Sequence, residues 1–132
     1  MIEPGKLTYL LAEKKSILVV SFIGPLVRTN AHVLEKCIKE ISKREATWVI
    51  VNFRDVPANL DRTVYPALAR LQQVIRSKPA ELKMTALHPE LRKQLDQQGL
   101  LRPKEVVDNL AIALQAVVAS AMTPSEPGQQ AA

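Results

Sequence analysis

Residues 47–53 read TWVIVNF, a short run rich in β-branched and aromatic side chains. Such a run is typical of a strand that lies inside a sheet and is covered on both faces. The polar stretch 54–63, RDVPANLDRT, follows it and predicts a loop at the end of this strand. Residues 47–53 therefore mark the expected centre of a sheet.

Two further apolar runs precede the central strand, LTYLL at 7–11 and ILVVSFI at 17–23. The polar stretch 13–16 between them predicts a hairpin turn. Gly24 and Pro25 end the second run. Because the second run is apolar nearly throughout, we expect it to lie inside the sheet, next to the central strand.

Residues 30–44 have the period of an amphipathic helix, which Thr29 or Asn30 could cap. Glu35 and Glu40 are spaced to pair with cations of the same helix, one turn away. The apolar face consists of Val33, Leu34, Cys37, Ile38 and Ile41, and the opposite face carries Lys36, Lys39 and Lys43. The lysines are expected to be a solvated helix face.

A second helix is predicted after the polar loop. Its apolar face consists of Val64, Leu68, Leu71 and Ile75, which follow one another at intervals of four, three and four residues. Pro66 limits where this helix can begin. Proline has no N–H, and its ring clashes with the carbonyl four residues back, so it must lie in the first turn. The N-cap can therefore be no earlier than Thr63, and Thr63 is the expected cap.

The remaining elements lie toward the C-terminus. LKMTAL at 82–87 predicts a strand, and Pro89 opens a short helix that Gly99 closes. Pro103 marks the expected start of the last helix, whose apolar face runs over 106–117. The polar, proline-containing stretch that follows this helix predicts a disordered tail.

The order of elements is strand, strand, helix, strand, helix, strand, helix, helix. It predicts an α/β fold with a mixed sheet of four to five strands and about four helices. An antiparallel N-terminal hairpin feeds a βαβαβ unit with right-handed crossovers. We expect one domain over 1–121 and a disordered tail over 122–132.

Composition excludes several classes of protein. Hydrophobic residues make up 47% of the 132 and charged residues 23%, which is typical of a soluble globular protein. One cysteine excludes a disulfide framework and a Cys-rich zinc site. No run approaches the ~18 apolar residues of a membrane span, and the start shows no secretory signal. We therefore expect a cytoplasmic protein.

The elements and landmarks resemble those of the STAS domain family over about 7–118. Residues 17–30, ILVVSFIGPLVRTN, look like the family's second strand and the Gly-x-Leu turn into its first helix. Residues 48–53, WVIVNF, look like its central strand. Residues 82–99, LKMTALHPELRKQLDQQG, followed by Leu100, look like its late strand, helix and Gly-Leu. The order and spacing carry the resemblance more than any single motif.

The resemblance implies a non-enzymatic module that binds proteins. The residues themselves predict no metal or cofactor site, because the two histidines lack partners at ligand spacing and no glycine-rich phosphate loop is present. In the family's anti-sigma-factor antagonists, a partner kinase phosphorylates a hydroxyl in an Asp-Ser-Ser-Gly-like motif after the central strand, and this turns binding off. Here the stretch reads Asp61, Arg62, Thr63 and Val64, so Thr63 is the candidate phospho-acceptor. Arg62 and Val64 replace the family's small residue and glycine, and Val27 stands where an aspartate is common.

The resemblance also implies a partner and a setting. The partner would be a kinase-like anti-sigma factor or a stressosome-type scaffold, in signal transduction that regulates transcription. The expected interface is the edge where residues 24–30, loop 59–63 and the start of the next helix meet, because loops that follow parallel strands gather at one end of the sheet. The candidate partner-binding residues are Arg28, Asn30, Asn59, Asp61, Arg62 and Thr63.

Other interpretations stay open. Thr63 could serve only as a helix cap. The chain could then be a constitutive scaffold subunit of a larger assembly or a transport complex. Whether it forms a homodimer is also open. A small enzyme could draw on Asp55, Asp61 and Thr63 but lacks a histidine partner. The net charge of +5 alone does not indicate a nucleic-acid ligand, and with aromatics at only 4% of the chain, none is expected. An exposed apolar patch around Thr63 would favour the binding module.

Overall fold

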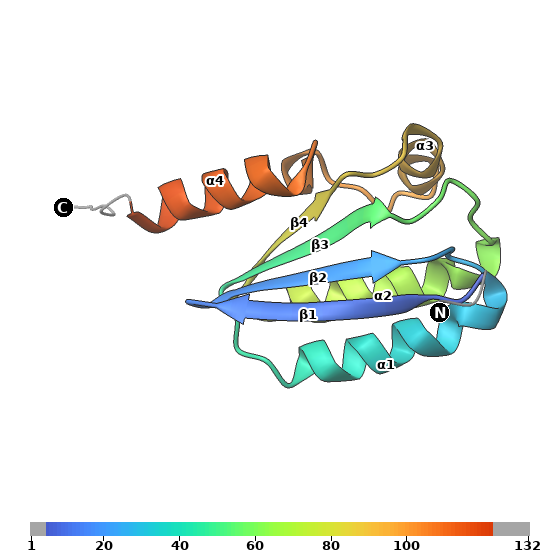
Figure 1. Ribbon diagram of the computed structural model, residues 1–132, viewed down its shortest axis with the longest axis horizontal. Coiled ribbons are helices and arrows are strands. Elements are labelled where there is room, and N and C mark those ends of the chain that lie inside the picture. The colour runs from blue at the N-terminus through green and yellow to red at the C-terminus, as the bar shows by residue number, and fades with distance from the viewer. Residues whose placement is uncertain (1–4, 123–132) are drawn as a thin grey trace.

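The computed structural model describes residues 5–122, which form five strands and four α-helices (Figure 1). The strands are β1 (Thr8–Lys14), β2 (Ile17–Ile23), β3 (Trp48–Asp55), β4 (Glu81–Thr85) and β5 (Val106–Val107). The helices are α1 (Ala31–Ser42), α2 (Tyr65–Arg76), α3 (Pro89–Gln97) and α4 (Leu110–Met122). Three short 3-10 turns, η1 (Arg28–Asn30), η2 (Arg62–Val64) and η3 (Pro103–Glu105), precede α1, α2 and β5.

The strands form one mixed sheet in the order β1-β2-β3-β4-β5. β1 is antiparallel to β2, and the other neighbouring pairs are parallel. β3 lies at the centre of the sheet, and its residues 49–53 are all buried. The predicted fold class and central strand are therefore confirmed.

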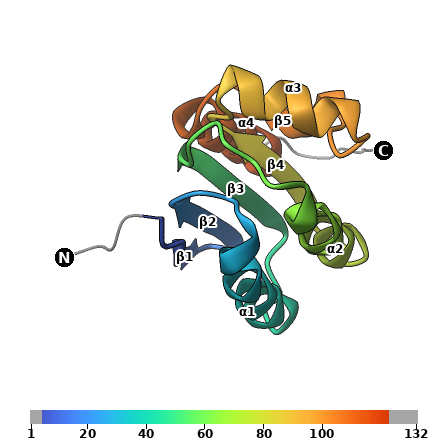
Figure 2. The ribbon, with the colours of Figure 1, turned by 90° about the vertical axis from the view of Figure 1, so that its right-hand side faces the viewer.

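Helices cover the two faces of the sheet unequally (Figures 1 and 2). α1 and α2 pack together on one face over the larger core, which includes Phe22 and Phe53 from the strands. α4 lies on the other face, where Ala113 and Val117 pack against Ile50 of β3 and form a smaller core. α3 lies beside the sheet and contributes two buried leucines to the larger core.

The hairpin turn is tighter than predicted. β1 extends to Lys14, which pairs with Ile17, so only Lys15 and Ser16 form the turn. Both have positive φ, 51° and 70°. Two consecutive left-handed residues twist the chain in the sense that β-strands require.

The predicted start of the last helix at Pro103 is wrong. Pro103 opens the turn η3, and Val106–Val107 then pair with β4 as the strand β5. α4 begins only at Leu110, where Asn109 Oδ1 accepts a hydrogen bond of 2.9 Å from the Ile112 N–H. The predicted tail lies outside the described residues apart from Met122, which ends α4.

Candidate functional site

The segments after β2 and β3 meet at one end of the sheet, as their positions in the sequence predicted (Figure 1). The Gly24 N–H donates to the Asp55 carbonyl at 3.0 Å, and the Asp61 N–H donates to the Leu26 carbonyl at 2.9 Å. Leu26 and Leu60 also form a parallel β-bridge. These bonds place the turns η1 and η2 side by side. We call residues 24–30 and 59–66 together the loop edge.

Asp61 organises the start of η2. Its Oδ1 accepts hydrogen bonds of 2.9 Å from both the N–H and the hydroxyl of Thr63. These two bonds lower the pKa of Asp61, and the backbone and positive charge of Arg28 lower it further. Asp61 is therefore an anion at neutral pH that holds the Thr63 hydroxyl in place and links the two turns electrostatically.

The expected capping role of Thr63 is wrong. Asp61 is the N-cap of η2, while α2 begins at Tyr65, and Val64 at its N-cap position makes no side-chain capping bond. The limit set by Pro66 holds, since this cap position is no earlier than Thr63. The identity of the capping residue differs because a 3-10 turn with its own cap precedes the α-helix. An Asp two residues before Thr63 is a signal that sequence reasoning could have used.

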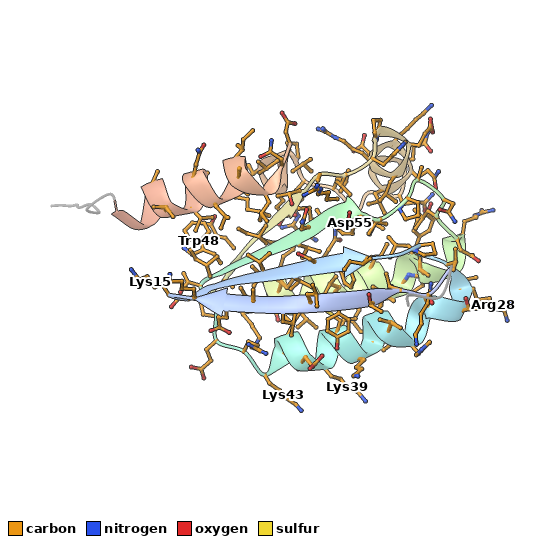
Figure 3. All side chains as sticks on the ribbon, viewed as in Figure 1. Lys15, Arg28, Lys39, Lys43, Trp48 and Asp55 are labelled. Atoms are coloured by element: carbon orange, nitrogen blue, oxygen red, sulfur yellow. The ribbon has the colours of Figure 1, made fainter. Side chains whose placement is uncertain are left out.

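The candidate residues differ in exposure. The side chains of Arg28, Asn59, Arg62 and Thr63 are exposed, and Figure 3 shows Arg28 pointing away from the end of the molecule. Val64, which follows Thr63, is fully buried. Hence the loop edge presents two arginines, an asparagine and a hydroxyl above a buried valine.

Asn30 does not belong to the exposed group, and its expected capping bond is absent. The residue is only 4% exposed. Its Nδ2 donates to the Gly5 carbonyl at 2.8 Å and to the Pro25 carbonyl at 2.9 Å. Both amide hydrogens are therefore used to fasten the chain before β1 to the turn after β2, and Asn30 contributes to the loop edge by holding its backbone.

Replacing Asn30 with alanine should lower the free energy of unfolding by about 1–3 kcal/mol, because the Gly5 and Pro25 carbonyls both lose their buried amide donor. Asn59→Ala is a matched control at an exposed position of the same edge, and it should change stability by less than about 0.5 kcal/mol. Urea unfolding of the two variants and the unmodified chain measures both values. Equal losses in the two variants would contradict the anchoring role of Asn30.

Replacing Asp61 with alanine should lower the melting temperature at pH 7, and the difference from the unmodified chain should shrink in acid. Because the pKa of Asp61 is lowered in the folded chain, its stabilising effect is complete above the unfolded pKa of about 4. The effect disappears as the pH falls through the folded pKa. Thermal unfolding between pH 7 and pH 2.5 measures this, and a difference independent of pH would contradict it.

The apolar patch around Thr63 that would have favoured the binding module is absent from the described part of the chain. The large apolar side chains that are exposed there are Leu10, Ile112 and Val118, which lie on β1 and α4. The loop edge is instead polar, with exposed cations at Arg28 and Arg62. A partner would therefore recognise it mainly through charge and hydrogen bonds.

Other reactive groups are engaged or isolated. Cys37 is fully buried, and burial raises the pKa of its thiol to about 12, which excludes a nucleophilic thiolate. His88 Nδ1 accepts from the Glu90 N–H at 3.2 Å and caps α3. Over residues 5–122, no three acidic, histidine or cysteine side chains are grouped to hold a metal ion. No helix in the same range has the length and hydropathy of a membrane span.

Comparison with known proteins adds a family and several structural neighbours. A family model described as "STAS domain" matches residues 9–113. No curated protein matches the chain. Among solved structures, an anti-sigma factor antagonist from Mycobacterium paratuberculosis has a TM-score of 0.74 at 21% identity. The match covers 89% of this chain and 99% of that one.

Two further solved structures have the same fold. A sulfate transporter family protein from Wolinella succinogenes has a TM-score of 0.71 at 21% identity, over 85% of this chain and 93% of that one. The phosphorylated form of the Bacillus cell fate determinant SpoIIAA has a TM-score of 0.65 at 18% identity, over 83% of this chain and 99% of that one. At these identities the likeness establishes a shared fold.

Proposed function

Because the chain belongs to the STAS domain family, we propose that it is a regulatory module that binds a partner protein at the loop edge. The observation that carries this proposal is the joining of η1 and η2, which presents Arg28, Arg62 and the fixed hydroxyl of Thr63 on one exposed surface. Arginine is over-represented among residues that dominate protein interfaces. The indicated ligand is therefore a protein surface with acidic groups.

The structural neighbours, which include an anti-sigma factor antagonist and SpoIIAA, support a protein partner by analogy. By analogy, the proposed partner is a kinase-like anti-sigma factor or a stressosome-type scaffold, in cytoplasmic signal transduction that controls transcription. The basic character of the loop edge is compatible with either partner. The comparisons indicate no enzyme family.

Phosphorylation of Thr63 is the proposed switch. Its hydroxyl is exposed and lies 2.9 Å from Asp61 Oδ1. A phosphate on this oxygen would add about 1.5–2 negative charges beside the Asp61 carboxylate and remove the hydrogen that the carboxylate accepts. Repulsion between the phosphate and the Asp61 carboxylate would rearrange η2. The added negative charge would also repel an acidic partner and release it.

A constitutive scaffold is the second candidate, and two observations favour it. The Thr63 hydroxyl already donates to Asp61, a bond that stabilises the turn without any modification. Val64 is fully buried where the family's phosphorylated motif has glycine. Under this alternative the loop edge still binds a partner, but Thr63 stays unmodified.

Affinity capture from the native cell tests the binding surface. The bait is compared with the double variant Arg28→Glu/Arg62→Glu and with the control Arg92→Glu/Arg102→Glu, which makes the same charge change at exposed sites that are not part of the loop edge. We expect the control to retain the partner and the loop-edge variant to lose it. Equal retention or equal loss in the two variants would contradict binding at the loop edge.

A further inference from the structure

β1 is an open edge of the sheet. Within residues 5–122 it pairs with β2 alone, over all seven residues Thr8–Lys14. In an antiparallel pair, alternate residues turn their N–H and C=O groups away from the neighbouring strand. An edge strand of this length can therefore template another strand. The opposite edge, β5, has only two residues.

A groove of about 620 Å³ lies between β1 and α1. Two acidic side chains in this region are already engaged: Glu40 accepts from the Tyr9 hydroxyl, and Glu13 Oε1 accepts from Arg44 Nη1 at 3.1 Å. Lys36 also lines the groove, is exposed, and has no acidic partner in the described chain. The groove consequently offers the cation of Lys36 to a ligand.

The ion pairs expected within α1 are not formed. Glu35 pairs with Arg70 of α2, and Glu40 bonds to Tyr9 of β1. Residues of neighbouring elements pair with both glutamates, because α1 packs against α2 and also contacts Tyr9 of β1. Lys39 on this helix and Lys43 at its C-cap point away from the sheet (Figure 3).

We propose that this groove binds an extended acidic segment of a partner protein, which joins β1 as an additional strand. Charge decides between this occupant and a second copy of the chain. Symmetric pairing of two β1 edges would bring the two α1 helices, with their lysines, toward each other. Like charges brought together oppose association, whereas acidic side chains would be attracted.

The side-chain pattern of the added strand follows from the two faces of β1. Tyr9 and Leu11 face the core on the α1 side, so Leu10, which is 64% exposed, faces the opposite side. Alternate residues of an added strand would meet Lys36 on one side and Leu10 on the other. The segment should therefore alternate acidic and apolar residues. This surface does not include Arg62 or Thr63, so it stands independently of the loop edge.

A labelled synthetic peptide of four Glu-Val repeats is the probe, and fluorescence anisotropy at low salt measures its Kd. Lys36→Glu changes a residue that lines the groove, while Lys43→Glu makes the same charge change at the C-cap of the same helix, outside the groove. We expect Lys36→Glu to weaken binding by about fivefold or more, and Lys43→Glu by less than about twofold. Circular dichroism confirms that both variants are folded.

The backbone part of the proposal has its own measurement. A fully N-methylated version of the peptide cannot donate to β1 and should not bind, and the unmodified peptide should slow amide exchange in β1. No binding of the unmodified peptide, equal losses in the two lysine variants, or unchanged binding of the methylated peptide would overturn the proposal. A concentration-dependent dimer that protects β1 without peptide would overturn it as well. Thr63→Glu should leave peptide binding unchanged, which separates this test from that of the loop edge.

Discussion

Replacing Gly24 with alanine is expected to lower the free energy of unfolding by about 3–5 kcal/mol. Gly24 has a φ of +119°, which strains any residue with a side chain. A Cβ there would also lie 2.3 Å from the Lys6 carbonyl oxygen and 3.0 Å from Leu7 Cα. Both are backbone atoms, so relief requires the chain before β1 to move.

Gly99→Ala is the matched control for this effect. Gly99 also has a positive φ, +70°, but a Cβ there would meet nothing within 4 Å. The Gly99→Ala substitution should lower the free energy of unfolding only by the strain of the left-handed conformation, about 1–2 kcal/mol. Urea unfolding of both variants separates backbone strain from steric clash. Equal decreases in the free energy of unfolding would show that the steric clash at Gly24 does not destabilise the variant.

Replacing Thr63 with glutamate should weaken binding to the captured partner by about 100-fold. The substitution removes the hydroxyl that donates to Asp61 and places a second carboxylate beside it. Like charges brought together at an interface cost several kcal/mol, and 100-fold corresponds to about 2.7 kcal/mol. Titration calorimetry with the purified partner measures the change.

Two controls make this result specific. Thr63→Ser keeps the hydroxyl and should bind within about threefold of the unmodified chain. Thr47→Glu makes the same substitution at an exposed position before β3, at the opposite end of that strand. It should leave affinity unchanged. If the Thr63→Glu variant also binds with unchanged affinity, the proposed phosphorylation switch is contradicted, and the constitutive scaffold is the proposal that remains.

The main features of the sheet could be predicted from the sequence because they depend on local patterns. The apolar runs at 17–23 and 47–53 became β2 and the buried part of β3. The position of Pro66 limited the start of α2 correctly. The meeting of residues 24–30 with 59–63 followed from topology alone, since both segments follow parallel neighbouring strands.

The features that sequence reasoning missed depend on neighbours distant in the chain. Val106–Val107 form a strand only because the edge of β4 is available beside them. Asn30 could not be distinguished from a cap until the Gly5 and Pro25 carbonyls were placed near it. Likewise, Glu35 pairs with Arg70 because α1 and α2 lie together, which no spacing within α1 reveals.

Amide hydrogen exchange of the chain, alone and bound to the captured partner, tests the central claim most directly. We predict that the partner slows exchange at residues 24–30 and 59–66, where η1 and η2 join. Protection confined to α4 or α3, with exchange at the loop edge unchanged, would contradict the proposed binding surface.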